Sequence, residues 1–388
     1  MKNKILGVNK NVFFLSLVSL FNDFSSEMIY SVMPAFLVKS LNAPLWFVGF
    51  LEGTADALVN ILKIFSGRLS DYYNKRKIFA VLGYTISNLT RFFLYFVNSI
   101  WQVFTLRIID RVGKGLRDAP RDALLYLSSD KEELNKSFNF HRAFDTIGAI
   151  LGPLLGFFLL NYFLNLNYKS LFLFGALVGF LAILTFIFVE DKKELHNKNK
   201  KIIFDFKIFS PKIKLYLLSF FIFSLGYFPL ALVLLRTQTI DPSLKFFPLF
   251  YFIFNLSFVI FAFILGKTAD KLGEDKVLII GFLTAISSYF LFLININLLV
   301  ILGIILLAFS LASIDGIKMV YIGKNVSSEY LATSQGTLNA LFGIGQLLGG
   351  SLSGYIWTKF SFAYSFIIGI ILMSISLLIL IKSLKINA

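Results

Sequence analysis

Long apolar stretches separated by short polar segments run through the whole chain. Twelve of them approach the roughly 20 residues that a helix needs to cross the hydrocarbon core of a membrane. The stretches are continuous, whereas the strands of a membrane β-barrel alternate between polar and apolar positions. The pattern therefore predicts twelve membrane-spanning helices, at residues 11–38, 46–66, 77–97, 100–122, 137–163, 169–190, 213–236, 246–265, 276–294, 298–321, 333–357 and 363–383.

Composition excludes several other classes of protein. Hydrophobic residues make up 57% of the 388 residues and charged residues only 15%, against roughly a quarter in soluble domains. A soluble enzyme and a disordered chain are therefore excluded. Cysteine is absent and there are only two histidines, which argues against disulfides and against most metal sites. We expect no cofactor, no metal and no enzymatic activity.

The net charge of +15 would suggest nucleic-acid binding in a soluble protein, but in a membrane protein it reflects topology. An even number of spans places both termini on one side. The segments on that side carry 23 lysines and arginines, and the opposite segments carry four. Trp46, Trp101 and Trp357 fall at predicted outer helix ends, which indoles favour. We expect a multi-pass protein of the cytoplasmic (inner) membrane, with both termini in the cytoplasm and no nucleic-acid partner.

The two halves of the chain are similar in sequence. Gly67-Arg-Leu-Ser-Asp71 follows the second span and Gly266-Lys-Thr-Ala-Asp270 follows the eighth, at an offset of 199 residues. Gly148-Ala-Ile-Leu-Gly152 in the fifth span matches Gly345-Gln-Leu-Leu-Gly349 in the eleventh, at an offset of 197 residues. Parallel repeats of six helices are known from transporters, whose substrate site lies between the repeats near the middle of the membrane.

A polar segment rich in Lys and Asn separates six predicted spans from the other six. We therefore predict an all-α polytopic membrane protein made of two six-helix bundles related by a parallel repeat. The predicted parts are an N-terminal bundle at 1–190, a cytoplasmic linker at 191–212 and a C-terminal bundle at 213–388.

These motifs resemble those of the major facilitator superfamily. The segment from Gly67 to Lys77 is similar to the signature loop that this family carries between spans 2 and 3, with Asn74 in place of the second glycine. The segment from Gly266 to Lys276 is a degenerate second copy. Gly152-Pro153-Leu-Leu-Gly156 is similar to the glycine–proline motif of the family's antiporters. The resemblance implies a transporter whose two six-helix bundles rock around a central site.

Two structural roles follow for the motif residues. Small residues let membrane helices approach closely, so we assign helix packing to Gly148, Gly152, Pro153 and Gly156. An acid at a helix end can meet a helix N-terminus or basic side chains, and such a contact can hold one conformation. The alternative is that the basic residues only set topology. The predicted conformational latch consists of Gly67, Asp71, Lys75, Arg76, Lys77, Gly266 and Asp270.

Charged residues inside the predicted spans are concentrated in the first half of the chain. A charge near the bilayer centre costs about 2.5–3.5 kcal/mol on insertion scales. Span 4 carries a stripe of charges at helical spacing from Arg107 to Asp122, and spans 1 and 2 carry acids at similar depths. Most corresponding positions of the second half are uncharged. We predict a role in proton coupling for Asp23, Glu27, Glu52, Asp56, Arg107, Asp110 and Arg111.

In this hypothesis the acids change their proton affinity when they move relative to Arg107 or Arg111. The resemblance supports it, because the family's proton antiporters carry an arginine in span 4. Arg107 matches that position loosely, since Arg111 stands where the family motif usually has glycine. The alternative is a static network of ion pairs that only makes the first half rigid.

Three further residues receive a purely structural interpretation. We expect His141 to be a polar residue near the inner boundary of the membrane and Arg236 to be an interfacial anchor. Pro120 is expected to kink or end span 4.

The predicted substrate-binding residues are Tyr30, Lys114, Asn255, Asn339 and Gln346.

The sequence as a whole predicts a secondary active transporter that moves a small organic solute by alternating access. We expect proton coupling, and export is favoured over uptake. One alternative is uptake of an organic anion by the basic face of span 4, and another is a membrane sensor without transport. We expect a monomer whose partners are its small-molecule substrate, protons and membrane lipid.

Overall fold

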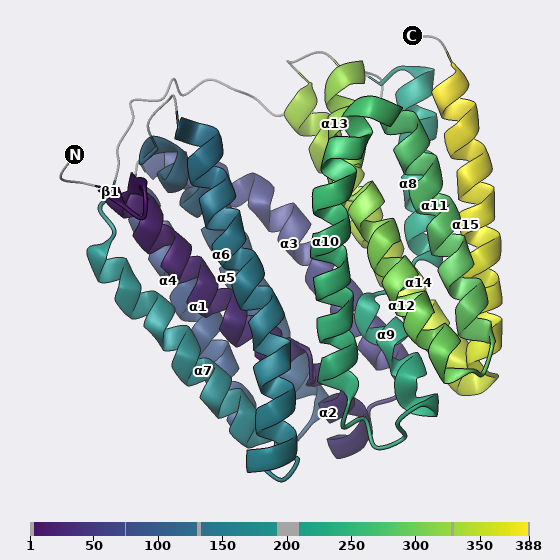
Figure 1. Ribbon diagram of the computed structural model, residues 1–388, viewed down its shortest axis with the longest axis horizontal. Coiled ribbons are helices and arrows are strands. Elements are labelled where there is room, and N and C mark those ends of the chain that lie inside the picture. Colours follow the sequence, from purple (N-terminus) through teal and green to yellow (C-terminus); the bar gives the residue numbers. More distant parts are fainter. Residues whose placement is uncertain (1–3, 74, 130–132, 192–208, 327–329, 387–388) are drawn as a thin grey trace. The chain divides into compact units, whose positions relative to one another are not determined.

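The computed structural model describes residues 4–73, 75–129, 133–191, 209–326 and 330–386, and the side chains of 60–61, 63–73, 135, 266–270 and 331–332 lie outside this description. The described residues are almost all helical (Figure 1). The helices of the first half are α1 (Lys10–Tyr30), α2 (Met33–Ser40), α3 (Leu45–Tyr73), α4 (Arg76–Phe93), α5 (Ile100–Leu127), α6 (Leu134–Phe158) and α7 (Tyr168–Thr185).

The second half repeats this pattern of long helices. Its helices are α8 (Pro211–Gly226), α9 (Leu230–Leu234), α10 (Phe247–Leu272), α11 (Glu274–Leu293), α12 (Asn297–Ile314), α13 (Ile317–Asn325), α14 (Leu331–Lys359) and α15 (Phe362–Lys385). Short 3-10 or π turns extend several of them, namely η1 (Leu94–Phe96), η3 (Leu159–Phe163), η4 (Phe186–Phe188) and η6 (Leu235–Thr239). A two-stranded hairpin of β1 (Lys4–Ile5) and β2 (Val8–Asn9) precedes α1.

Each of the twelve predicted spans coincides with one helix or with two consecutive helices, which confirms the predicted all-α polytopic fold. Within the described residues, nine helical stretches are long and apolar enough to cross a membrane by length and composition alone. Three other long helices are not among these nine: α3, α5 and α14. The reason is visible in α5, which carries the charged stripe, and in α14, which is rich in glycine and serine.

Two spans are interrupted at corresponding places of the repeat. The first span divides into α1 and α2 just before Pro34, and the seventh divides into α8 and α9 at Pro229. Proline has no backbone N–H to donate to the preceding turn, so a helix is easily broken there. Pro120 behaves differently, because α5 continues through it to Leu127. Of the two outcomes expected at Pro120, a kink or an end of span 4, the second is therefore wrong.

Contacts divide the chain into two compact units, which are described separately. Unit 1 comprises Met1–Phe36 and Leu58–Asn199, and unit 2 comprises Leu37–Ala57 and Lys200–Ala388. The first half of α3 thus belongs to unit 2, where it packs against α14. A Cβ atom added to Gly53 of α3 would lie 2.5 Å from the Cα of Leu347. Most of the predicted linker at 191–212 falls on 192–208, which lie outside the described residues.

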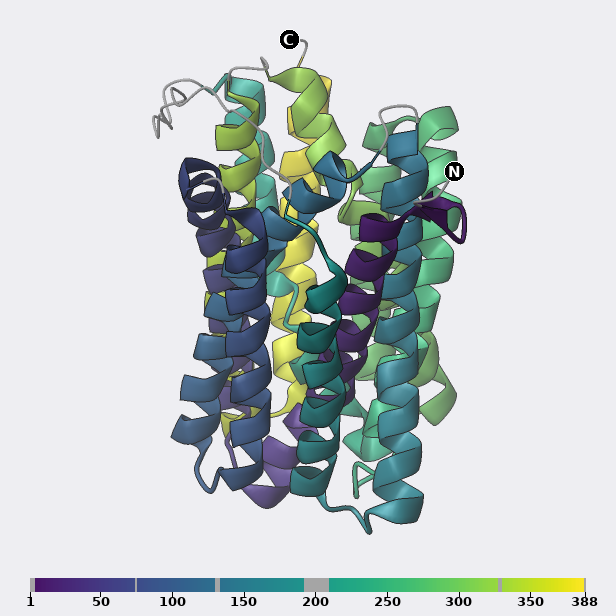
Figure 2. The ribbon, with the colours of Figure 1, turned by 90° about the vertical axis from the view of Figure 1, so that its left-hand side faces the viewer.

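Equivalent helices make equivalent contacts in the two units (Figures 1 and 2). In unit 1, α1 packs against α6 and α7, and α4 packs against α5 and α7. In unit 2, α8 packs against α14 and α15, and α11 packs against α12 and α15. When the halves are aligned, each pair in unit 2 is the counterpart of a pair in unit 1. The repeated sequence therefore folds as a repeated structure.

The contact between α1 and α6 depends on the glycine–proline motif. A Cβ atom added to Gly148 would lie 2.6 Å from the carbonyl oxygen of Leu20, and one added to Gly152 would lie 2.6 Å from that of Phe24. One turn further, Gly156 lies against Met28, while Pro153 lies inside α6. The two backbones can approach this closely only because these positions carry no side chain.

Candidate functional site

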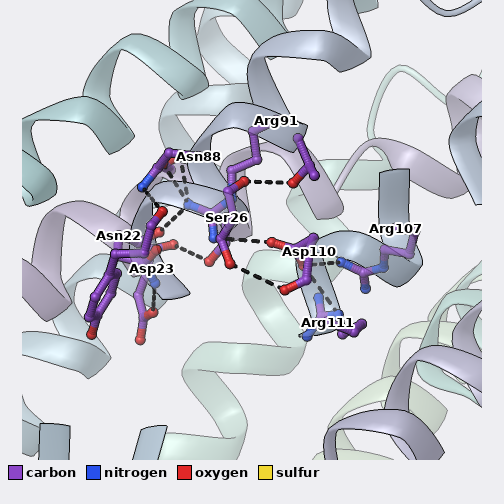
Figure 3. A network of polar contacts seen from close by, with 12 residues as sticks. Asn22, Asp23, Ser26, Asn88, Arg91, Arg107, Asp110 and Arg111 are labelled. Carbon is purple, nitrogen blue, oxygen red and sulfur yellow. Dashed lines mark hydrogen bonds and ion pairs between the residues drawn. The ribbon is translucent and has the colours of Figure 1, made fainter. Parts of the chain in front are cut away.

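Four charged side chains meet in the interior of unit 1 (Figure 3). Asp110 of α5 lies at the centre, with its Oδ2 atom 3.3 Å from Nε of Arg111 and 3.8 Å from Nη1 of Arg107. Arg91 of α4 approaches the other carboxylate oxygen, with Nη2 3.7 Å from Oδ1. These four residues are called the Asp110 cluster below. None of the four side chains is more than 9% exposed, so this part of the charged stripe faces the interior of unit 1.

The ion pairs of the Asp110 cluster are loose. Direct hydrogen bonds between a guanidinium group and a carboxylate usually measure about 2.7–2.9 Å, and the three pairs here span 3.3–3.8 Å. Among the described residues, Oδ1 of Asp110 and Nε of Arg111 are buried without a hydrogen-bond partner. The arginines thus supply counter-charge without fixed hydrogen-bond geometry. Small side-chain movements are enough to exchange partners in such an arrangement.

Arg91 links the Asp110 cluster to α1. Its Nη1 atom donates hydrogen bonds of 3.2 Å to the backbone carbonyl of Asn22, to Oγ of Ser25 and to Oδ1 of Asn88. The side chain of Asn22 in turn donates to Oδ1 of Asp23 at 2.9 Å. A continuous set of polar contacts therefore joins α5, α4 and α1 (Figure 3). The predicted coupling residues did not include Arg91, although a charge within the otherwise apolar span 3 was a signal for it.

Tyr30 forms the aromatic side of the cluster. The guanidinium carbon of Arg107 lies 3.6 Å from the centroid of its ring, and that of Arg111 lies 5.1 Å away. Cations placed over an aromatic face are attracted by its quadrupole. Tyr30, predicted to bind substrate, therefore holds two arginines in place in this structure.

A second polar layer lies further along α5. Nη1 of Arg117 donates to Oγ of Ser87 at 2.7 Å, and its guanidinium group lies 4.5 Å from the ring centroid of Tyr84. Ser87 donates to the backbone carbonyl of Asp110 at 3.2 Å. Lys114 lies between the two layers and is half-buried. The predicted stripe is thus divided into layers that contact different neighbours.

The remaining predicted coupling and substrate residues lie elsewhere. Glu27 is half-buried on α1, where its Cβ atom faces Gly152. Glu52 and Asp56 lie on the part of α3 that belongs to unit 2. The predicted substrate residues Asn255 on α10 and Asn339 and Gln346 on α14 are half-buried and belong to unit 2. Within unit 1 the structure therefore brings together Asp23, Tyr30, Arg107, Asp110 and Arg111.

The predicted latch is described only in part. The surroundings of Gly67, Gly266 and the side chains of Asp71 and Asp270 lie outside the described part of the chain. Of the basic residues, Lys75 is exposed and Arg76 is buried. The backbone N–H of Lys77 donates to the carboxylate of Asp191 at 3.2 Å.

Arg236 is packed inside unit 2. We expected it to be an interfacial anchor, and its side chain is only 1% exposed. Its Nε atom donates to the backbone carbonyl of Phe292 at 2.9 Å, and its guanidinium group lies 4.0 Å from the ring centroid of Phe362. The polar ends of helices in unit 2 satisfy this charge, so the side chain does not need to reach water.

Comparisons with known proteins agree with this architecture. The family model of the Major Facilitator Superfamily matches residues 15–235 and 215–386. An uncharacterized MFS-type transporter of Methanocaldococcus jannaschii, MJ1317, is 32% identical over 382 residues, which are 96% of this chain and 95% of that protein. The multidrug resistance protein MdtH of Photorhabdus laumondii is 26% identical over 135 residues, which are 35% of this chain and 33% of that protein.

Solved structures show the same fold. A mutant of the nucleoside transporter NupG superposes with a TM-score of 0.83 over 96% of this chain and 100% of that chain. The two sequences are only 14% identical. At this identity the likeness concerns the arrangement of helices alone.

Proposed function

The chain belongs to the Major Facilitator Superfamily, and we propose that it is a proton-coupled secondary transporter of a small organic solute, with export favoured over uptake. The observation that carries this proposal is the buried Asp110 cluster and its connection through Arg91 to Asp23. Each charge placed within a membrane costs several kcal/mol unless it is compensated, so membrane proteins rarely keep such groups without a function.

The second unit supplies an internal comparison for the cluster. With the halves aligned at 197 residues, the positions of Asp23, Arg91, Asp110 and Arg111 correspond to Phe220, Ser288, Leu307 and Ala308. All four of these are buried, and their helices make the same contacts as those of unit 1. The bundle can therefore be built without charges at these places. Stability of the fold is not a sufficient reason for the charges of unit 1.

Within the network, we assign different roles to the two acids. Asp110 is surrounded by three guanidinium groups and serves as their counter-ion. Asp23 is half-buried and contacts Asn22, and it lies within electrostatic range of Lys114, Arg117, Arg121 and Asp145. A carboxylate changes its proton affinity when the charges near it move. Asp23 is thus the acid that binds and releases the transported proton in this proposal.

The favoured direction of transport is inferred from a similar protein. MdtH, which is similar over 35% of this chain, is named a multidrug resistance protein. This name supports export of an organic solute as the favoured direction.

Uptake of an organic anion is the second candidate, and the three guanidinium groups of the Asp110 cluster favour it. An anionic substrate can replace Asp110 as the partner of Arg107 or Arg111, because carboxylates and phosphates bind guanidinium groups through charge-assisted hydrogen bonds. In that case proton movement is not required for transport.

The test uses purified protein in lipid vesicles that contain the pH-sensitive dye pyranine. Ethidium, uridine and benzoate serve as cationic, neutral and anionic probes. We expect at least one probe to move protons in the wild type. Asp23→Asn should abolish this movement and keep exchange of the same probe at equal pH on both sides. Asp315→Asn is the matched control, because Asp315 lies on the other unit with its side chain 57% exposed.

Proton movement that persists in Asp23→Asn contradicts the assignment of Asp23. Uptake of benzoate without proton movement, abolished by Arg111→Gln, supports anion uptake instead.

A further inference from the structure

A second pair of titratable residues lies on α6 outside the Asp110 cluster. Nε2 of His141 lies 3.7 Å from Oδ1 of Asp145, one helical turn away, and the side chain of His141 is only 5% exposed. Among the described residues, both ring nitrogens of His141 and Oδ1 of Asp145 are buried without a hydrogen-bond partner. Leaving a buried polar atom unsatisfied costs about 1–3 kcal/mol. The pair therefore weakens the fold in this conformation.

Charged and polar groups from two neighbouring helices face this pair. On α5, Arg121 and Asp122 interact electrostatically with His141. The same two residues and Asp118 interact electrostatically with Asp145. From α1, Asp145 is faced by Ser19 and Asp23. Arg121 also approaches Ser19, with 3.5 Å between Nη1 and Oγ.

These groups form an ordered series along the contact between α1 and α6. Asp145 follows His141 by one turn of α6, and Gly148 follows Asp145 by nearly another turn, at a rise of about 1.5 Å per residue. A Cβ atom added to Gly148 would lie 3.3 Å from the Cβ of Asp23. Because α6 begins at Leu134, the series runs from the predicted cytoplasmic end of the helix to Asp23.

Unit 2 carries no titratable group at the two matching positions of α14. At the offset of 197 residues, His141 corresponds to Leu338, Asp145 to Phe342 and Arg121 to Lys318. Leu338 is fully buried. The ammonium group of Lys318 lies 4.7 Å from the ring centroid of Phe342. In unit 1 the corresponding pair is Arg121 and Asp145, which interact electrostatically. An apolar version of this contact therefore folds, and the polar version in unit 1 calls for another explanation.

We propose that His141 and Asp145 form a proton-transfer site that carries protons between the cytoplasmic end of unit 1 and Asp23. The inference rests on the proposed function, in which Asp23 binds the transported proton. Imidazole suits this task because either ring nitrogen can accept or donate a proton.

The transfer conserves one proton at each step. A ring nitrogen of neutral His141 accepts a proton from water and the imidazole becomes positively charged. Nε2 then donates its proton to the carboxylate of Asp145 when the 3.7 Å gap between them closes, and the imidazole is neutral again. Asp145 passes the proton to Asp23 and returns to the carboxylate form. The reverse order releases a proton to the cytoplasmic side.

The test uses the same pyranine vesicles with ethidium, uridine and benzoate. His141→Leu introduces the residue that unit 2 carries at this place, so we expect it to fold. Probe-driven proton movement should fall at least about tenfold, as is typical when a general acid–base is removed. Exchange of the probe at equal pH should stay within about twofold, since that reaction needs no net proton transfer. His196→Gln, which removes the other histidine, is the matched control and should behave like the wild type.

Chemical rescue separates proton transfer from a structural role. Imidazole added to the His141→Ala variant should restore proton movement, because a free base can occupy the space of the missing ring. Normal proton movement in His141→Leu, together with its loss in Asp23→Asn, overturns the transfer site and leaves the proposed function intact. Exchange without any proton movement in the wild type overturns both.

Discussion

Removal of the Asp110 carboxylate is the sharpest test of the buried cluster. At an effective dielectric constant of about 20, unit charges separated by the observed 3.3–3.8 Å attract each other by roughly 4–5 kcal/mol. Asp110→Asn loses this attraction to three arginines at once. Part of the loss is offset because Arg91 keeps its hydrogen bonds to Asn22, Ser25 and Asn88. Measured losses for breaking a buried ion pair are about 3–5 kcal/mol, and we expect a destabilisation in this range.

The measurement is a denaturant titration of the purified protein in detergent micelles, followed by tryptophan fluorescence. The double variant Arg91→Met, Asp110→Asn removes one uncompensated arginine together with the acid. It should be at least about 1 kcal/mol more stable than the sum of the single changes implies, because residues in one network are not additive. Glu274→Gln disrupts an exposed pair with Lys324 and should cost less than about 1 kcal/mol.

Two results together would refute this reasoning. The free energy of unfolding of Asp110→Asn would lie within about 1 kcal/mol of the wild type, which is roughly what a surface ion pair contributes. The effects of Asp110→Asn and Arg91→Met on this free energy would simply add. These results would mean that the arginines do not depend on Asp110 for their counter-charge.

Two further predictions concern packing and pH. Gly152→Ala should destabilise unit 1 by about 1–3 kcal/mol, because the new Cβ atom would lie 2.6 Å from the carbonyl oxygen of Phe24. Gly316→Ala is the control, because its Cβ atom would meet nothing within 4 Å. Equal melting temperatures of the two variants would contradict the close contact. The hydrogen bond from Lys4 lowers the pKa of Glu133 below its ordinary value of 4.5. The stabilisation from this exposed pair is therefore present above pH 4.5 and is lost as the pH falls further. The melting temperatures of the wild type and Glu133→Gln should converge in acid. A difference between them that widens in acid would disprove the stabilising role of the pair.

Helix positions could be predicted from the sequence because the membrane requires a certain apolar length. The span predicted at 100–122 begins at Ile100 as expected, and the span predicted at 363–383 is observed as Phe362–Lys385. The interruptions within spans were not predicted. A helix break at Pro34 or Pro229 depends on whether neighbouring helices satisfy the freed carbonyl groups, and Pro120 shows that they can do so without a break.

The partners of the charged residues were harder to predict than their presence. Sequence spacing places Arg107 and Arg111 on one face of a helix, and their depth matches that of acids in spans 1 and 2. The structure pairs both arginines with Asp110 of their own helix and adds Arg91 from α4. Depth along a helix follows from counting residues, but the rotation of a helix and the identity of its neighbours depend on packing. Arg236 illustrates the same point, since its carbonyl partners at Phe292 and Ile294 carry no signal in the sequence.

The difference between the two units bears on whether the charges are static or functional. In unit 2 the equivalent interior contains stacked or tilted aromatic rings, such as Tyr216 on Tyr321 at 4.6 Å and Phe223 on Phe282 at 4.1 Å between centroids. These contacts between rings hold the same helix arrangement by apolar packing. A network that served only rigidity would be expected to form direct hydrogen bonds, because loose ion pairs do not repay the cost of removing charges from water. The contacts of Asp110 exceed that length, and the ring of His141 has no hydrogen-bond partner among the described residues. These features support the proposal that groups in the polar interior of unit 1 change partners during transport.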